Sequence, residues 1–361
     1  MKGSMKAVVL HAPGEYEVET IDIPQTGYGE VLVEIRSVSI CGSDPGIFNG
    51  LVREKDGWPP HYPFIAGHEF AGRVVEVGPG VNSLQIGDRV SGEAHCGCGT
   101  CEMCKQGLYN LCDNYGRAGH HHYGHAAPGC YAQYQVYNEK ALTVMPDGIS
   151  YDEGSMVDTA GTAFNGMRLI GIVPGGWTAV IGPGPMGIML AQMAKAMGSR
   201  AIIIGYQDRD RLAVAEKVGI DYCIETTEVD DVVKEVRRIT GGRGVDRAFD
   251  CAGAHDTLDE LIRMTAKNGK AAVIAYPKMP TTLDALYYMV KNQITVQGVR
   301  ANPNCARTVL NMMANGSLDA ASLVTHHFPI EETKKAFDIF ANHKDGVVKV
   351  CILPNGSNDE E

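Results

Sequence analysis

The 361-residue chain lacks the features that mark membrane proteins and nucleic-acid-binding proteins. It has no apolar run of the roughly 18 to 20 residues that a transmembrane helix needs, and its first residues, "MKGSMKAVVL", lack the apolar core of a signal peptide. Its lysines and arginines form no cluster, and its formal net charge is −11, which argues against nucleic acid or an anionic membrane as the main partner. We therefore expect a cytoplasmic protein.

The chain also lacks internal repeats and low-complexity linkers, and its length suggests two domains. Residues 5–150 carry short alternating runs rich in valine and isoleucine, such as "VLVEIRSVSI", which predict a β-rich barrel or sandwich. Beyond that part, short apolar runs alternate with helix-like segments such as "MGIMLAQMAKAMG". This alternation predicts a doubly wound parallel sheet, so the whole chain should be an α/β protein.

A glycine-rich loop follows the first strand expected for the parallel sheet, in "WTAVIGPGPMG". Gly182, Gly184 and Gly187 form the pattern G-x-G-x-x-G, with Pro185 and Met186 inside it. Glycines permit the tight turn and let backbone N–H groups approach a pyrophosphate at the N-terminus of a helix. Because strand, glycines and helix occur in the required order, the loop predicts a dinucleotide-binding site.

The choice between NAD and NADP depends on the end of the second strand, where an acid normally binds the ribose of NAD. Counting back from Arg211, the expected position holds Tyr206, which cannot accept two ribose hydroxyls as a carboxylate does. Asp208 could substitute for the acid, or Arg209 could pair with the 2′-phosphate of NADP. Both cofactors therefore stay open, as does the possibility that these are ordinary turn charges.

Five cysteines crowd the stretch "HCGCGTCEMCKQGLYNLC". A disulfide knot, a redox pair and a metal site compete to explain them, and in a cytoplasmic protein a dense cluster favours metal. Cys98, Cys101, Cys104 and Cys112 have the spacing C-x2-C-x2-C-x7-C, and four thiolates can enclose one tetrahedral Zn²⁺. Such a closed site is structural, and Cys96 is then a spare thiol beside it.

A second, open zinc site is indicated by "SICGSD" and "IAGHEFAG", which contain Cys41 and His68. A catalytic zinc needs a third protein ligand and an open position. Glu69, adjacent to His68, and Asp158, in "SMVDTAG", are both candidates for the third ligand.

The chemistry of that site would be alcohol oxidation. Zinc lowers the pKa of a bound alcohol, and the alkoxide then transfers hydride to a nicotinamide. The Ser43 hydroxyl lies two residues from Cys41 and suits a proton relay. Asp44 is a plausible partner that orients His68.

These motifs, in this order, resemble those of the zinc-dependent medium-chain dehydrogenases. The resemblance covers essentially the whole chain and rests on "CGSD", "GHEFAG", the cysteine cluster and "GPGPMG". It implies a GroES-like catalytic domain, residues 1–156 and 297–361, with a structural zinc lobe at residues 95–113. It further implies a Rossmann domain at residues 157–296 that binds NAD or NADP, two zinc ions per chain, and a homodimer or homotetramer.

Within the family, "SGEAH", "PGCYAQY" and "THHF" look most like threonine and sorbitol dehydrogenases. The resemblance implies that Asp158 favours a polyhydroxylated or amino-alcohol substrate, and that His95 matches a histidine beside the active site. The loop "GRAGHHHYGHAAPG" departs from the threonine enzymes. Its histidines, at 120–122 and 125, could line the substrate pocket, but we favour a solvated surface loop.

Two other functions compete with this interpretation. A zinc-free quinone or enoyl reductase of the same fold would not need Cys41, His68 and Glu69, and a non-enzymatic binding protein would have lost one of these ligands. We therefore expect a zinc-dependent oxidoreductase that transfers hydride between a secondary alcohol and NAD or NADP. The alcohol would be a polyol, a sugar or an amino alcohol such as threonine.

Overall fold

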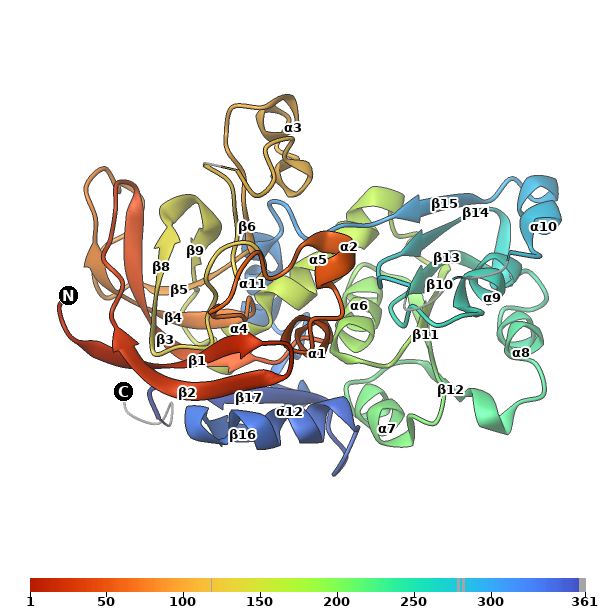
Figure 1. The fold of residues 1–361 in the computed structure, drawn as a ribbon. Helices are drawn as coiled ribbons and strands as arrows, with labels where there is room; N and C mark the ends of the chain where they lie inside the picture. Colours follow the sequence, from red (N-terminus) through yellow and green to blue (C-terminus); the bar gives the residue numbers. More distant parts are fainter. Residues whose placement is uncertain (118, 278–279, 281–282, 357–361) are drawn as a thin grey trace. The chain divides into compact units, whose positions relative to one another are not determined.

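The computed structural model describes residues 1–117, 119–277, 280 and 283–356. The chain divides into two compact units (Figure 1). The first comprises Met1–Thr159, Asn302–Ala314 and Val324–Glu361, and the second Ala160–Ala301 and Asn315–Leu323.

The first unit is built around a mixed sheet with strand order β16-β17-β3-β4-β5-β9, and β8 also pairs with β3. Next to it lies the antiparallel hairpin of β1 and β2, and a short pair, β6 and β7, adjoins the cysteine-rich lobe. The strands are β1 (Ser4–Ala12), β2 (Glu15–Asp22), β3 (Glu30–Ser39), β4 (Phe70–Val77), β5 (Arg89–Gly92), β6 (His95–Cys96), β7 (His121–His122), β8 (Tyr134–Asn138), β9 (Leu142–Val144), β16 (Val324–Pro329) and β17 (Lys349–Leu353).

Short helices connect or cover these strands, and α12 lies against β16 and β17 (Figure 1). One of them, α4, begins with a capping box in which the Ser150 hydroxyl accepts from the backbone of Glu153 while the Glu153 carboxylate reaches back. The helices are α1 (Asp44–Phe48), α2 (Arg53–Asp56), α3 (Glu102–Lys105), α4 (Tyr151–Ser155), α11 (Ala306–Ala314) and α12 (Thr333–Ala341), and α5 (Val157–Ile170) begins here and continues into the second unit.

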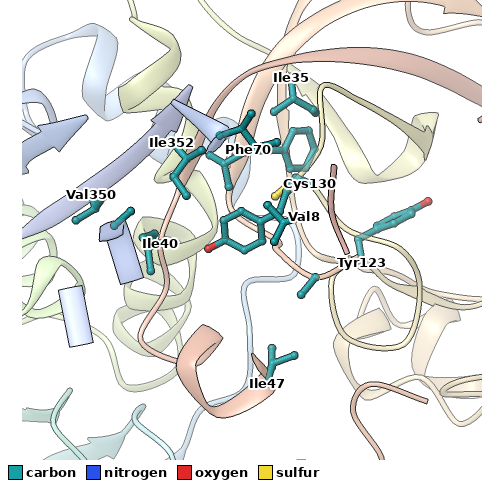
Figure 2. Packing of buried hydrophobic residues seen from close by; sticks show 14 of the residues in the cluster. Val8, Ile35, Ile40, Ile47, Phe70, Tyr123, Cys130, Val350 and Ile352 are labelled. Atoms are coloured by element: carbon teal, nitrogen blue, oxygen red, sulfur yellow. The ribbon is translucent and has the colours of Figure 1, made fainter. Parts of the chain in front are cut away.

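The alternating valine and isoleucine side chains of β3 build the core of the first unit. Ile35 and Phe70 are buried there with Val350 and Ile352 from β17 (Figure 2), and the Phe70 ring stacks on Tyr137 at 4.2 Å. Segments far apart in sequence thus share one core, which fixes the register of β17 against β3.

The second unit is a parallel sheet with strand order β12-β11-β10-β13-β14-β15 (Figure 1). The whole of β10 is buried, as expected for a parallel strand covered on both faces. The strands are β10 (Trp177–Ile181), β11 (Arg200–Gly205), β12 (Tyr222–Glu225), β13 (Val245–Asp250), β14 (Thr265–Val273) and β15 (Thr295–Gly298); the helices are α6 (Pro185–Ala196), α7 (Arg209–Lys217), α8 (Val232–Ile239), α9 (Thr257–Met264) and α10 (Leu286–Lys291).

The strand order of this sheet reverses at β10, which lies between β11 and β13. Ligands of such sheets bind beyond the carboxyl ends of the strands at this switch point. Residue 182 follows β10 directly, so the glycine loop occupies that position. The α/β fold class expected from the sequence is confirmed. Among the described residues, no helix has both the length and the apolarity needed to cross a bilayer.

Candidate metal centre and cofactor loop

One edge of the mixed sheet brings together the predicted ligands of the open zinc site. Cys41 follows the end of β3, while His68 and Glu69 precede the start of β4. Because β3 and β4 are antiparallel, these two strand ends lie at the same edge. The Cys41 sulfur, a His68 ring nitrogen and a Glu69 carboxylate oxygen all lie within 4.8 Å of one another. Sulfur, imidazole nitrogen and carboxylate oxygen at this spacing fit a zinc ion.

Asp44 connects the two ligand-bearing loops, as a partner that orients His68 should. Its Oδ1 atom lies 3.5 Å from Nδ1 of His68. Its Oδ2 atom accepts from the backbone N–H of Cys41 at 2.9 Å and from the Tyr131 hydroxyl at 2.6 Å. Burial lowers the pKa of His68, but the negative charges of Cys41 and Asp44 outweigh burial and raise this pKa well above its usual value.

Glu69 is held by three side chains from separate elements. The Ser39 hydroxyl donates to Oε2 at 2.6 Å, the Lys349 ammonium donates to the same oxygen at 2.5 Å, and the Thr159 hydroxyl donates to Oε1. Burial opposes ionisation of this carboxyl group, but the charges of Lys349 and His68 and the hydrogen bonds from Lys349 and Ser39 bring the pKa of Glu69 down to about 2. The carboxylate is therefore ionised across the physiological pH range.

Sequence reasoning missed Lys349. A signal was present, because a single lysine stands inside the apolar run "VVKVCIL". A charged residue at a buried strand position is rarely tolerated unless it has a partner.

Asp158, the other candidate for the third ligand, makes different contacts. Its Oδ1 atom accepts from the backbone N–H of Ala94 at 3.2 Å and from the Asn302 amide at 3.0 Å. Burial raises its pKa, and the nearby His68 opposes that shift. Within the described part of the chain, the ligand group of the open site contains Glu69 and does not include Asp158.

The predicted relay residue Ser43 is exposed, at the start of α1. Its hydroxyl therefore reaches solvent within two residues of Cys41. Its part in a relay stays a prediction.

The histidine-rich loop is not the solvated surface loop that we favoured. His120, His122 and His125 are buried, and so is His95. The rings form a stack, with His125 on His122 at 3.8 Å and His122 on His95 at 3.9 Å. His125 also lies 4.6 Å from the ring of His68. These flat rings shield one another from water, so four histidines are buried although histidine is usually half-exposed.

The cysteine lobe has the geometry of a closed zinc site. The sulfur atoms of Cys98, Cys101, Cys104 and Cys112 all lie within 4.8 Å of one another. Two of the separations are 3.9 Å and 3.8 Å, and a tetrahedron with Zn–S bonds of about 2.3 Å has edges of about 3.8 Å. Backbone N–H groups of Cys101 and Cys104 point at these sulfurs at 3.4 Å and stabilise thiolates. Cys96 is buried outside this group.

In the second unit, the glycine loop can be built only with glycine at two of its positions. Gly182 has φ +100, and a Cβ atom on Gly187 would lie 1.9 Å from the Gly182 carbonyl oxygen. A Cβ atom on Gly184 would meet nothing within 4 Å, which leaves space for a ligand. Pro185 and Met186 open α6, whose N-terminus has no side-chain cap. Its first N–H groups can therefore bind a pyrophosphate.

The charged residues near the expected ribose position are paired. Tyr206 is 67% exposed. Asp208 lies 3.6 Å from Arg211, and Arg209 pairs with Glu228.

Glu225, at the end of β12, was missed from the sequence. Its carboxylate accepts from the backbone N–H groups of Gln207 at 3.0 Å and Asp208 at 2.9 Å, so it holds the loop after β11 in place. Burial would raise the pKa of Glu225, but these N–H groups lower it overall. An acid at the end of the neighbouring strand, in "DYCIE", was the available signal.

The fold agrees with the comparisons to known proteins. Residues 27–147 match the alcohol dehydrogenase GroES-like domain, and residues 185–315 match the zinc-binding dehydrogenase family. The chain is 32% identical to sorbitol dehydrogenase of Bacillus subtilis over 98% of each chain. It is 31% identical to L-threonine 3-dehydrogenase of Bacillus licheniformis over 98% of this chain and 100% of that one.

Among solved structures, a putative zinc-binding dehydrogenase from Sinorhizobium meliloti, bound to NADP, superposes with a TM-score of 0.87. It is 26% identical, and the match covers 98% of this chain and 100% of that chain. The chain therefore belongs to the zinc-dependent medium-chain dehydrogenases, in the branch of the polyol and threonine dehydrogenases, and is an oxidoreductase that uses a nicotinamide cofactor.

Proposed function

We propose that the chain binds two zinc ions and oxidises the secondary alcohol of a polyol, sugar or amino alcohol. The observation that carries the proposal is the contrast between the two ligand groups. The lobe offers four sulfurs and forms a closed shell, whereas the other group offers three donors, Cys41, His68 and Glu69, of which Cys41 is partly exposed. Three protein donors leave a coordination position for a substrate, as catalytic zinc sites require.

Each residue near the open site has a distinct part in this proposal. A bound zinc supplies a Lewis acid for the alcohol oxygen, and a bound nicotinamide accepts the hydride. Glu69, rather than Asp158, completes the ligand set, because its oxygen lies with the other two donors. Asp44 orients the His68 ring through Nδ1. Ser43, exposed beside Cys41, passes the alcohol proton to solvent.

Polar side chains near His68 support a substrate with several polar groups. His125 lies against the His68 ring, and the stack continues through His122 to His95. Asp158 adds a carboxylate whose charge acts on His68. The relatives named for sorbitol and threonine act on compounds with polar groups next to the reacting carbon, and we extend that class to this chain.

We propose NAD rather than NADP as the cofactor. A 2′-phosphate needs a cation that is available to pair with it. Arg209 already pairs with Glu228, and Arg211 lies beside Asp208. Binding NADP would therefore cost one of these ion pairs. We also propose that the protein acts in the cytoplasm as a homo-oligomer, either a dimer or a tetramer.

A substrate screen tests this function. Purified enzyme is assayed with secondary alcohols, polyols, sugars and threonine, each with NAD⁺ and with NADP⁺. We expect kcat/KM for a polyol or amino alcohol to exceed that for 2-propanol by about tenfold or more, since each additional matched polar contact contributes roughly 1.4 kcal/mol. We expect NAD⁺ to be reduced faster than NADP⁺. Activity confined to quinones or enoyl compounds would contradict the proposal.

A further inference from the structure

Three strands of the first unit meet at the edge that carries the open ligand group. In the sheet, β3 lies between β17 and β4 and is antiparallel to both. The C-terminal end of β3 therefore lies beside the first residues of β4 and of β17. Those positions hold Ile40 and Cys41 after β3, His68 and Glu69 before β4, and Lys349 as the first residue of β17.

Lys349 is a fully buried cation, with 2% of its surface exposed. Its neighbours in the sequence, Val347, Val348 and Val350, are buried and apolar. Taking an ammonium group out of water is unfavourable unless the group is paired and hydrogen-bonded. A buried apolar side chain at this position would avoid that cost, so stability of the strand does not account for the lysine.

The Lys349 ammonium joins the two ligand-bearing loops. It donates to the backbone carbonyl of Ile40 at 2.9 Å and to Oε2 of Glu69 at 2.5 Å. Ile40 precedes the ligand Cys41, and Glu69 follows the ligand His68. The backbone of Ile40 is also tied to β17, because its N–H donates to the carbonyl of Val350 at 3.0 Å, and both side chains lie in the core (Figure 2).

The remaining contacts of Glu69 complete the same arrangement. Ser39, the last residue of β3, shares Oε2 with Lys349, and Thr159 donates to Oε1. Donors on both oxygens prevent the carboxylate from rotating freely. The Lys349 ammonium also lies against the Glu69 carboxylate, in a region that holds Asp44 and Cys41 as well.

We propose that Lys349 is a positioning residue of the metal centre. It fastens the Cys41 loop to the carboxylate beside His68, so that sulfur, nitrogen and oxygen donors stand at metal-binding distances before the metal arrives. The hydroxyls of Ser39 and Thr159 help to position the same carboxylate, but to a smaller extent. The proposal rests on the proposed zinc function of Cys41, His68 and Glu69, since it concerns how that set is held.

Cobalt binding tests the proposal without reference to turnover. The open site is emptied by mild chelation, the lobe keeps its metal, and Co²⁺ is titrated while the thiolate-to-cobalt absorption band is recorded. We expect Lys349→Met to raise the dissociation constant for Co²⁺ about tenfold or more, the usual effect of losing an outer partner of a ligand. Lys349→Arg, which keeps the cation, should stay within about threefold of the parent. Binding by Lys349→Met within twofold of the parent overturns the proposal.

Two further variants keep the proposal testable if Lys349→Met does not fold. The double variant Ser39→Ala/Thr159→Val removes both hydroxyl donors to Glu69 without leaving an unpaired buried cation. It should weaken Co²⁺ binding about threefold and shift the absorption band, because the carboxylate is less constrained. An unchanged affinity and band would overturn the proposal.

Cys41→Ser separates this inference from the function on which it rests. If Cys41→Ser keeps the thiolate-to-cobalt band at the open site, the proposed zinc site itself is wrong. If Cys41→Ser loses the band while Lys349→Met behaves as the parent, only the role of Lys349 is wrong.

Discussion

At the scale of single residues, the predicted ligands of the open site are held by neighbouring polar groups. Asp44 contacts both ligand loops, through the Cys41 N–H group and the His68 ring. The His68 ring has a fixed orientation because the Asp44 carboxylate faces its Nδ1 atom. Such partners also fix which ring nitrogen carries the proton.

Replacing Asp44 by asparagine tests whether activity depends on this carboxylate. The amide has the same shape but no charge, and its NH₂ group cannot accept from the Cys41 N–H group or from Tyr131 as a carboxylate oxygen does. We expect kcat/KM to fall about 10- to 100-fold with little change in secondary structure by circular dichroism. The matched control is Asp338→Asn, an exposed carboxylate paired with Lys344, which should keep parental activity. Parental kcat/KM in Asp44→Asn would contradict the role of Asp44.

At this scale the sequence was only partly informative. Cys41 and His68 could be singled out because each lies in a short motif whose chemistry is recognisable, but the sequence left Glu69 and Asp158 open as the third ligand. The lysine inside "VVKVCIL" indicated a buried charge, but its pairing with Glu69 could not be predicted. Lys349 lies 280 positions from Glu69 and reaches it only through the pairing of β17 with β3. The burial of His122 and His125 was likewise hidden, since it depends on rings from separate segments stacking together.

At the scale of elements, the cysteine lobe has little buried apolar surface of its own. The helix α3 has four residues and buries none of them. A segment this short cannot fold through apolar burial alone, so the four sulfurs supply its organisation. We therefore expect metal binding to contribute to the folding free energy of the lobe.

Replacing Cys101 by serine should therefore cost stability as well as metal. We expect the zinc content to fall by one ion per chain. A loss of about 3 kcal/mol in the free energy of unfolding, modest for a structural zinc, should lower the melting temperature by roughly 4 °C. Cys96→Ser makes the same chemical change beside the group and should keep its zinc. An unaltered zinc content in Cys101→Ser would contradict the assignment of the lobe.

Single helices, strands and loops were easier to predict from the sequence than the contacts between them. The sequence pattern around the glycine loop is local. It therefore predicted the loop, the strand before it and the helix after it. The loop after β11 depends instead on Glu225 from the adjacent strand β12, which no local pattern links to Asp208.

At the scale of the whole molecule, the first unit is completed by the end of the chain. Residues from β16, β17 and α12 share a core with residues from β1 and β3. The C-terminal segment thus contributes both packing and the buried Lys349 to the site formed by N-terminal residues. The α/β class followed from composition and periodicity, and so did the division into a β-rich part and a part in which strands and helices alternate. The return of the chain to the first unit rests instead on non-local strand pairing.

We propose that one of two zinc ions, held by Cys41, His68 and Glu69, supports alcohol oxidation. The most direct measurement is the zinc content of the parent and of Cys41→Ser by mass spectrometry, taken together with turnover on the best substrate of the screen. We expect two zinc ions in the parent, one in Cys41→Ser, and a loss of turnover of about a thousandfold or more with the fold intact. A single zinc in the parent, or normal turnover in Cys41→Ser, would contradict it.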